Sequence, residues 1–289
     1  MLQEVHMSFD EVGMESIDLK QERLFELLRG MGRVTVAFSG GVDSTYLLAA
    51  CLECLGPEQV LAVLAVSPLH PGGERREAEA LAGRLGARLQ TVETDLLADE
   101  RIASNPPDRC YFCKSRLFAD ILRLAGPPGA AQLVHGVTAD DLDDYRPGLR
   151  AARECGARAP LLEAGLGKAE VRELSRRLGL PTWDKPAAAC LASRVPYGAR
   201  LSAGLLGKIE QGEDLLRPGL GFRQVRLRVH GDVARLEFDP ADFPRLLSPG
   251  LRQAIVDRLK ELGFAYVCLD LQGFRSGSLN EVLPERRAE

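Results

Sequence analysis

The segment Ser39-Gly-Gly-Val-Asp-Ser44 has the composition of a loop that binds phosphate. Gly40 and Gly41 permit backbone angles that turn several N–H groups inward, and they let phosphate oxygens approach without meeting a Cβ atom. The two serines can donate hydroxyl hydrogen bonds, and a helix predicted to begin near Ser44 adds the positive end of its dipole. The segment lacks the Gly-Lys-Ser/Thr of a P-loop, so no lysine reaches a γ-phosphate from it. We therefore expect it to bind pyrophosphate; a tight turn without a ligand would leave the serines and the aspartate without a use.

Three cysteines form a second group that could do chemistry. Cys110 and Cys113 lie in Cys-Tyr-Phe-Cys-Lys at the start of a predicted helix, and Cys190 lies far along the chain. The positive end of a helix lowers the pKa of a thiol. Three thiolates could hold a [4Fe–4S] cluster with one iron open, but zinc is a competing occupant, and a redox pair or plain packing is the alternative. Cys51 and Cys54 have the same spacing inside an apolar helix, so we expect them in the core.

The alternation of short apolar runs with stretches of helical spacing predicts the scaffold for these groups. It indicates an α/β fold with a parallel, doubly wound sheet. The ligand site of such a sheet is at its carboxyl edge, where the phosphate loop and the thiols should face each other. The predicted strands are 34–38, 60–66, 88–92, 132–137 and 160–162, and the predicted helices are 18–28, 45–55, 74–85, 110–124 and 168–178.

The pattern changes after about residue 200, which predicts a second domain. Helices are expected over 203–216 and 252–262, and strands over 224–229, 233–238 and 265–269. Gly231-Asp232 suits a hairpin turn between two of these strands. We therefore predict an α/β domain over 1–200 and a smaller α+β domain over 201–289 that contributes to substrate binding and oligomerisation.

The overall composition excludes several classes of protein. The chain has 289 residues, 45% of them hydrophobic, and a net charge of −4. This balance argues against a broad nucleic-acid surface. The N-terminal segment carries carboxylates where a signal peptide needs a positive start, and the longest apolar run is too short to cross a bilayer. We expect a cytoplasmic protein without a membrane partner. An odd number of cysteines, seven, in a reducing compartment argues against a disulfide framework.

Four motifs in order carry a resemblance to a known family. They are SGGVDST at 39–45, RCYFCK at 109–114, GVTADDLDDYRPG at 136–148 and ACLASRVPYG at 189–198. The first resembles the PP-loop of the ATP pyrophosphatases, whose fold is of the PP-loop/HUP type. Together, over about residues 18–280, they resemble the LarE family of ATP-dependent sulfur transferases of nickel-pincer nucleotide synthesis. The resemblance implies that MgATP adenylates the carboxylates of pyridinium-3,5-dicarboxylate mononucleotide, which become thiocarboxylates with release of AMP and pyrophosphate.

The resemblance also implies roles for particular residues. In one branch of the family a cysteine that matches Cys190 gives up its own sulfur; the additional Cys110 and Cys113 are typical of the other branch, in which three cysteines carry a [4Fe–4S] cluster. Sulfur would then come from a donor protein or from free sulfide. The catalytic set is Cys110, Cys113, Cys190, Arg194 and Glu213. The nucleotide and substrate set is Ser39, Gly40, Gly41, Asp43, Ser44, Ser67, Gly136, Arg226, Arg228 and Arg275.

Some alternatives stay open on the sequence. Asp140 and Asp141 could hold Mg²⁺ or ribose, or they could form an exposed acidic loop. A tRNA thiouridylase would share the phosphate loop and the thiols, but it needs a basic RNA surface that this composition does not indicate. An ATP-dependent amide synthetase or a nucleotide sensor without catalysis would leave the three thiols unexplained. We expect a small-molecule nucleotide as the substrate and a homo-oligomer as the assembly.

Overall fold

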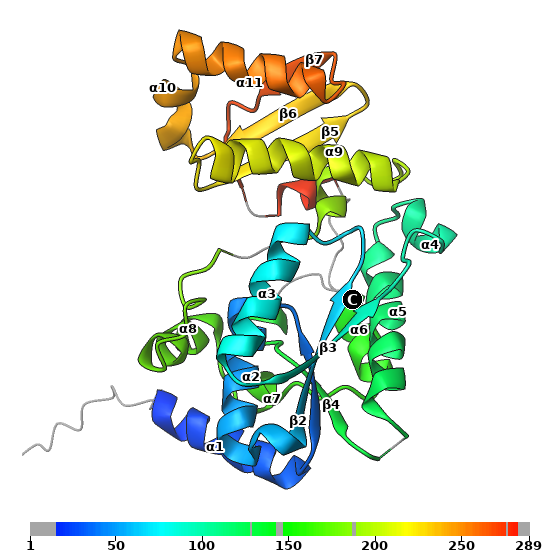
Figure 1. Ribbon diagram of the computed structural model, residues 1–289, viewed down its shortest axis with the longest axis vertical. Coiled ribbons are helices and arrows are strands. Elements are labelled where there is room, and N and C mark those ends of the chain that lie inside the picture. The colour runs from blue at the N-terminus through cyan, green and yellow to red at the C-terminus, as the bar shows by residue number, and fades with distance from the viewer. Residues whose placement is uncertain (1–15, 128, 143–146, 187–188, 276, 283–289) are drawn as a thin grey trace, which may run out of the picture.

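The structure is a computed structural model that describes residues 16–127, 129–142, 147–186, 189–275 and 277–282. Figure 1 shows two units, each built on its own sheet and stacked along the long axis. The first unit holds the N-terminal part of the chain. The second unit holds the helices and strands that follow residue 200.

The first unit is built on a four-stranded parallel sheet. Its strands lie in the order β3-β2-β1-β4, and every neighbouring pair is parallel. The bounds are β1 (Val34–Phe38), β2 (Val60–Val66), β3 (Arg88–Glu93) and β4 (Gln132–His135). The central strands β1 and β2 are rich in valine and largely buried, as expected for strands covered on both faces. The predicted α/β fold with a parallel sheet is confirmed.

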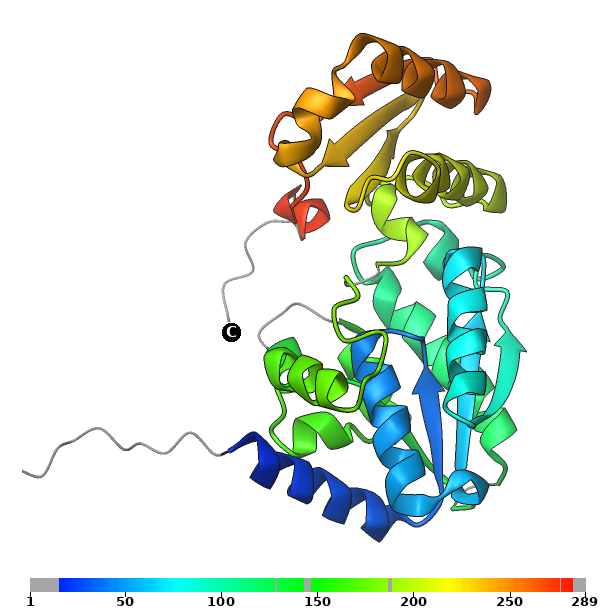
Figure 2. The same cartoon turned by 60° about the vertical axis from the view of Figure 1, so that its left-hand side comes forward.

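Helices cover both faces of this sheet (Figure 2). One apolar cluster packs against the face that carries α1 (Ile17–Met31), α2 (Val42–Leu55), α3 (Gly72–Arg84) and α8 (Lys168–Arg177). A smaller cluster on the opposite face contains residues of α5 (Arg109–Ala125) and α6 (Pro147–Glu154). Cys51 is buried in the first cluster and Cys54 packs against it, which confirms their predicted place in the core.

The strand predicted over 160–162 is wrong, because the chain there forms the short helix α7 (Pro160–Glu163). Pro160 occupies the first helical turn, where its missing N–H costs nothing, whereas in a sheet it would remove a ladder hydrogen bond. Among the described residues, the sheet continues beyond β4 only through an isolated bridge between Val134 and Arg158. Three further helices, α4 (Glu100–Ala103), α6 and α10 (Phe243–Leu246), were not predicted.

The second unit has a three-stranded sheet in the order β5-β6-β7, and α9 and α11 pack against it. Strands β5 and β6 form an antiparallel hairpin around Gly231, whose φ is 60°, and β7 is parallel to β6. This arrangement confirms the predicted order of helices and strands. The elements are α9 (Ala203–Asp214), β5 (Val225–His230), β6 (Val233–Phe238), α11 (Pro249–Glu261) and β7 (Tyr266–Leu269).

One apolar cluster joins the two units. It contains Leu69 and Leu96 from loops of the first sheet, Leu191 from the connecting segment, and Leu206 and Leu227 from the second unit. The units therefore share part of their core, while the predicted domain boundary near residue 200 stays a prediction. All seven cysteines are free thiols, and among the described helices none is both long and apolar enough to cross a membrane.

Candidate active site

The phosphate loop connects β1 to α2 and is held in shape by its own residues. Gly40 has a φ of 70°, and a Cβ added to it would lie 2.7 Å from Cβ of Ala78 on α3. The hydroxyl of Ser44 accepts from the N–H of Ser39 at 3.3 Å and lies 3.1 Å from the Ser39 hydroxyl. Gly41 is the N-cap of α2 and offers no side-chain cap. The first N–H groups of α2 therefore have no capping side chain and suit an anion.

The other predicted nucleotide residues lie around this loop. A Cβ on Gly136, which follows β4, would lie 2.8 Å from the backbone nitrogen of Ser44. Asp43 is in the first turn of α2. Ser67 follows β2; its hydroxyl lies 3.1 Å from Nδ1 of His70 and accepts from the N–H of Leu69. The structure thus brings the loop, Gly136 and Ser67 to the carboxyl edge of the sheet.

The thiols of Cys110 and Cys190 meet at the guanidinium of Arg109, which is 3% exposed. Nη2 of Arg109 lies 3.7 Å from Sγ of Cys110 and 4.0 Å from Sγ of Cys190. The side-chain oxygen of Asn105 accepts from Arg109, and its amide donates to the carbonyls of Val195 and Pro196 at 3.2 and 2.8 Å. These bonds tie the segment around Cys190 to the start of α5.

Cys113 lies in the same environment, mostly buried. Burial raises the pKa of its thiol to about 12, and neighbouring Cys190 and Cys110 act in the same direction against Lys114. Burial lowers the pKa of Arg109, but the two thiols beside it outweigh burial and raise that pKa.

Cys110 and Cys190 both lie within 4.0 Å of Arg109, and Cys113 interacts electrostatically with both thiols. Among the described residues, no three His, Cys, Asp or Glu side chains are grouped to hold a metal ion. A zinc ion needs its ligands around a single centre, whereas in a [4Fe–4S] cluster each thiolate binds a different iron. Three thiolates are a donor set that such a cluster takes, and a cluster at this place stays a prediction.

The segment 185–191 connects the phosphate loop with the thiols. At its start, Nζ of Lys185 donates to the carbonyl of Gly40 at 3.3 Å. At its end, the N–H of Leu191 donates to the carbonyl of Leu69, beyond β2, at 2.8 Å. Residues 187 and 188 lie outside the described residues. The phosphate loop and the thiols therefore lie along the same edge of the sheet.

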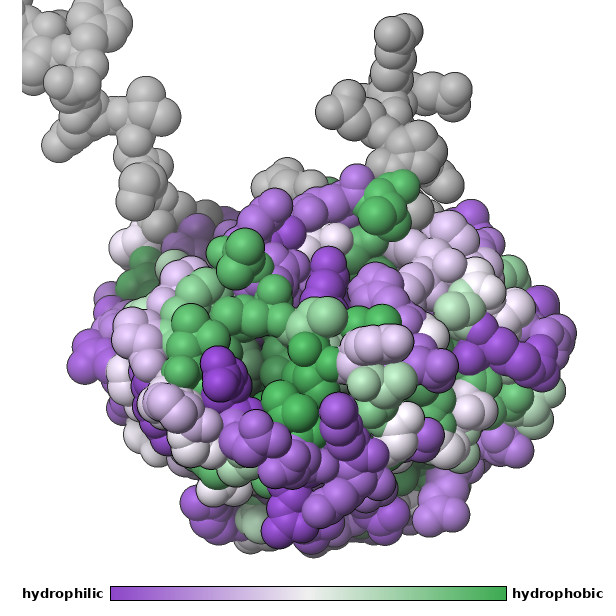
Figure 3. Space-filling view, turned by 90° about the horizontal axis from the view of Figure 1, so that it is seen from above, coloured by the Kyte–Doolittle hydropathy of each residue, from purple (hydrophilic) through white to green (hydrophobic). Residues whose placement is uncertain are grey.

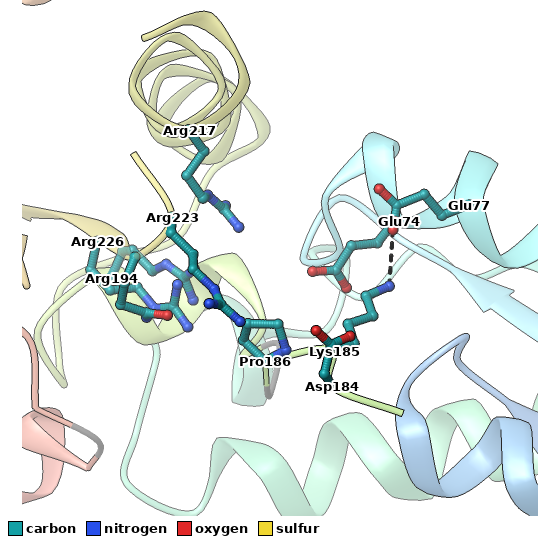
Figure 4. Close-up of a pocket in the computed structure, with 10 residues that line it drawn as sticks. Glu74, Glu77, Asp184, Lys185, Pro186, Arg194, Arg217, Arg223 and Arg226 are labelled. Atoms are coloured by element: carbon teal, nitrogen blue, oxygen red, sulfur yellow. Dashed lines mark hydrogen bonds and ion pairs between the residues drawn. The ribbon is translucent and has the colours of Figure 1, made fainter. Parts of the chain in front are cut away.

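A cavity of about 510 Å³ lies beside this edge, between the two units. Figure 4 shows arginines on one side of it and Glu74, Glu77, Asp184 and Lys185 on the other. Sequence reasoning assigned Arg194 and Arg226 to the site but missed Arg217, Arg223 and Lys185. The cavity is lined by Glu74, Glu77, Asp184, Lys185, Pro186, Arg194, Arg217, Arg223, Gln224 and Arg226.

The charged side chains that line the cavity shift one another's pKa values. Burial raises the pKa of Glu74, while the charges of Lys185, Arg217 and Arg194 oppose that rise. Burial lowers the pKa of Arg226 to about 10, and the positive charge of Arg194 adds to this effect. An anionic ligand would stabilise these crowded cations, so the cavity is suited to phosphate and carboxylate groups.

Arg194 and Glu213 form a buried bidentate ion pair with distances of 2.8 and 2.9 Å. Nη1 of Arg194 also donates to the carbonyls of Ala189 and Cys190, at 2.7 and 3.1 Å. Burial would raise the pKa of Glu213, but hydrogen bonds and charge from Arg194 and Arg217 hold it below its usual range. The pair therefore fixes the backbone of Cys190 against α9; a direct part of either residue in catalysis stays a prediction.

Two predicted arginines are paired away from the cavity. Arg228 binds both carboxylate oxygens of Glu237 at 3.0 Å and donates to Ser278 at 2.7 Å. Arg275 binds both oxygens of Glu281 at 3.1 Å. Neither is among the described residues that line the cavity. Their contact with substrate stays a prediction.

Asp140 and Asp141 fix the turn after β4. Oδ2 of Asp140 accepts from the N–H of Lys168 at 2.6 Å. Asp141 is buried; it accepts from the N–H of Thr138 at 3.0 Å and pairs with Nζ of Lys168 at 2.7 Å. These bonds indicate a structural role. Residues 143–146 of this motif lie outside the described residues.

Comparison with known proteins gives the family. Residues 27–102 match the NAD synthase family. The chain is 41% identical over 270 residues to the pyridinium-3,5-bisthiocarboxylic acid mononucleotide synthase of Lactiplantibacillus plantarum, covering 93% of this chain and 97% of that protein. It is 40% identical over 267 residues to an uncharacterized protein of Synechocystis, covering 92% and 99%. A tRNA-specific 2-thiouridylase of Azorhizobium caulinodans is 31% identical over 191 residues, covering 53% and 49%. The matches to the Lactiplantibacillus and Synechocystis proteins extend over nearly the whole of each chain. The protein therefore belongs to the LarE-type family of PP-loop proteins, together with the pyridinium-3,5-bisthiocarboxylic acid mononucleotide synthase.

Proposed function

We propose that this protein is an ATP-dependent sulfurtransferase that converts the carboxylates of pyridinium-3,5-dicarboxylate mononucleotide into thiocarboxylates. One observation carries the proposal: an arginine-lined cavity lies between the phosphate loop and the segment that bears Cys190. A substrate with a phosphate and two carboxylates needs several guanidinium groups around it. Lys185 connects this cavity to the phosphate loop, and Arg194 connects it to the backbone of Cys190.

The phosphate loop would carry the adenylation step. Its N–H groups and the N-terminus of α2 would bind the pyrophosphate part of MgATP and stabilise the charge that develops on the leaving group. Arg217, Arg223 and Arg226 would orient the nucleotide so that a carboxylate approaches the α-phosphorus. All three belong to the C-terminal part of the chain, which supports the predicted role of that part in substrate binding.

Cys110, Cys113 and Cys190 would hold a [4Fe–4S] cluster, which supplies sulfur for transfer when it is bound. Arg109 contacts the first and last of these thiols, and Cys113 is partly buried beside them. Sulfur would be replaced from a donor protein or from free sulfide. The alternative is transfer of the sulfur of Cys190 itself, which would allow one turnover.

Anaerobic purification, iron and sulfide analysis and a multiple-turnover assay test this proposal. We expect iron and sulfide in the protein and more than one thiocarboxylate per chain when sulfide is supplied. Cys110→Ser should abolish both the iron and sulfide content and the multiple turnovers. Cys268→Ser, at an exposed free thiol on β7, should abolish neither. Iron-free protein that forms one product and loses the sulfur of Cys190 would overturn the cluster. Thiolation of tRNA without thiocarboxylate formation would favour the thiouridylase.

The predicted homo-oligomer and the predicted cytoplasmic location stay predictions. Figure 3 shows the outer end of the second unit, where a hollowed apolar area is surrounded by hydrophilic residues. Exposed apolar side chains of this unit include Leu247, Tyr266 and Leu271. We propose that association between copies uses this end of the molecule, because large exposed apolar patches mark interaction sites. Light scattering after size-exclusion chromatography tests it.

A further inference from the structure

Lys185 lies where the cavity meets the phosphate loop. Its ammonium donates to the carbonyl of Gly40 at 3.3 Å and to the carboxylate of Glu77, on α3, at 3.0 Å. It also lines the cavity with Asp184 and Pro186 (Figure 4). The Lys185 side chain is 22% exposed, so its charge is partly removed from solvent.

The turn that carries Lys185 is held by the first unit. Arg172, on α8, donates to the carbonyls of Trp183 and Lys185 at 2.7 and 2.9 Å. The N–H of Lys185 donates to the carbonyl of Thr182 at 3.0 Å. The backbone of the lysine is thus placed by α8, independently of its side-chain contacts with the phosphate loop and α3.

The current partners of the ammonium are ones that a phosphate could replace. An ammonium has three donors, and Lys185 directs them to a neutral carbonyl and to Glu77, whose side chain is 67% exposed. A pair with such an exposed carboxylate is weak. The guanidinium groups of Arg194 and Arg217, in contrast, are both bonded to the buried carboxylate of Glu213. Lys185 is therefore better placed than either to move onto a reacting anion.

Adenylation requires such a cation, because a negatively charged carboxylate must approach a triphosphate that is also negatively charged. We propose that Lys185 is a catalytic residue of this step, an inference that rests on the proposed function. A carboxylate oxygen forms a bond to the α-phosphorus of ATP while the bond from that phosphorus to the bridging oxygen breaks. Both electrons of the broken bond leave with pyrophosphate, and no proton or redox equivalent is transferred. The ammonium neutralises charge on the α-phosphate and on the incoming carboxylate as they meet.

Substrate-dependent exchange of radiolabelled pyrophosphate into ATP isolates this step from sulfur transfer. Lys185→Met should lower the exchange kcat about 100- to 1000-fold, the usual effect of losing one group that stabilises transition-state charge. The Kd of the Lys185→Met protein for ATP should change far less than its kcat. Glu77→Gln removes the charged partner of Lys185 but keeps the cation, so its exchange kcat should fall much less than that of Lys185→Met. Ethylammonium should restore part of the exchange activity of Lys185→Ala. The control Lys260→Met, at an exposed position of α11, should match the wild type.

The outcomes separate this inference from the proposed function. Exchange by Lys185→Met within about threefold of the wild type would overturn the role of the lysine. An equal loss in Glu77→Gln, or no response of Lys185→Ala to ethylammonium, would assign Lys185 a structural role and overturn it as well. A folded wild-type protein that shows no exchange with the pyridinium nucleotide would instead refute the proposed function itself.

Discussion

Replacing Gly136 by alanine should displace the start of α2, because the glycine lies directly against it. An added Cβ would lie 2.8 Å from the nitrogen of Ser44, 2.9 Å from the carbonyl carbon of Asp43 and 3.0 Å from Cα of Ser44. All three are backbone atoms, so no side-chain rotation relieves the overlap. The φ of Gly136 is outside the left-handed region, so the effect comes from this contact alone.

The size of the effect follows from the overlap. Forcing an extra methyl group into a filled space costs about 1–3 kcal/mol. If the protein relieves the strain by moving the phosphate loop, ATP affinity should fall about 5- to 150-fold, since 1.4 kcal/mol is a factor of ten. If the loop stays in place, the same strain should lower the free energy of unfolding by about 1–3 kcal/mol.

Calorimetric titration with a non-hydrolysable ATP analogue and urea unfolding measure the two quantities. Gly207→Ala is the control, because a Cβ at Gly207 on α9 would meet nothing nearer than the flexible side chain of Gln211, at 4.0 Å. This control should bind ATP normally and unfold at the same or a slightly higher urea concentration. A Gly136→Ala protein with both wild-type ATP affinity and wild-type unfolding free energy would show that the contact between Gly136 and α2 is not tight.

The burial of titratable side chains leads to three further tests, on Glu213, on two histidines and on Cys113. Glu213→Gln should lower the free energy of unfolding by about 3–5 kcal/mol, because it leaves a buried guanidinium without its carboxylate; Arg275→Gln, at an exposed pair, should cost less than about 1 kcal/mol in the same urea titration. Burial lowers the pKa of His70 and of His135 from the ordinary 6.5 to about 4. Both histidines therefore contribute to the stability of the folded protein when the pH is above 6.5, and this contribution is lost as the pH falls toward 4. Substitution of both by glutamine should flatten the dependence of unfolding free energy on pH in that range; an unchanged slope would contradict the assignment. In the metal-free protein, iodoacetamide at pH 8 should modify Cys113 more slowly than the exposed cysteine on β7, because the thiol pKa of Cys113 is raised to about 12; peptide mass spectrometry gives the two rates.

The elements of the first sheet show how far local pattern can be trusted. Strands β1 and β2 have the bounds predicted for them, because a β-branched apolar run that is covered on both faces has few alternatives. Helix α2 begins at Val42, three residues before its prediction, because the phosphate loop itself enters the first helical turn. The error at residues 160–162 arose because three apolar residues are too few for periodicity to distinguish a strand from a helical turn.

Residue types and their spacing along the chain were enough to predict the chemical groups of the site. The phosphate loop and the Cys110–Cys113 pair are short motifs, so their residue types and spacing can be recognised without knowledge of the fold. The cations that accompany these groups became visible in the fold and not before. Arg109 between two thiols, Lys185 at the phosphate loop and the arginines of the second unit all act through segments that are distant in sequence. The partner of a charged side chain depends on which surfaces the fold brings together, and no local spacing specifies that.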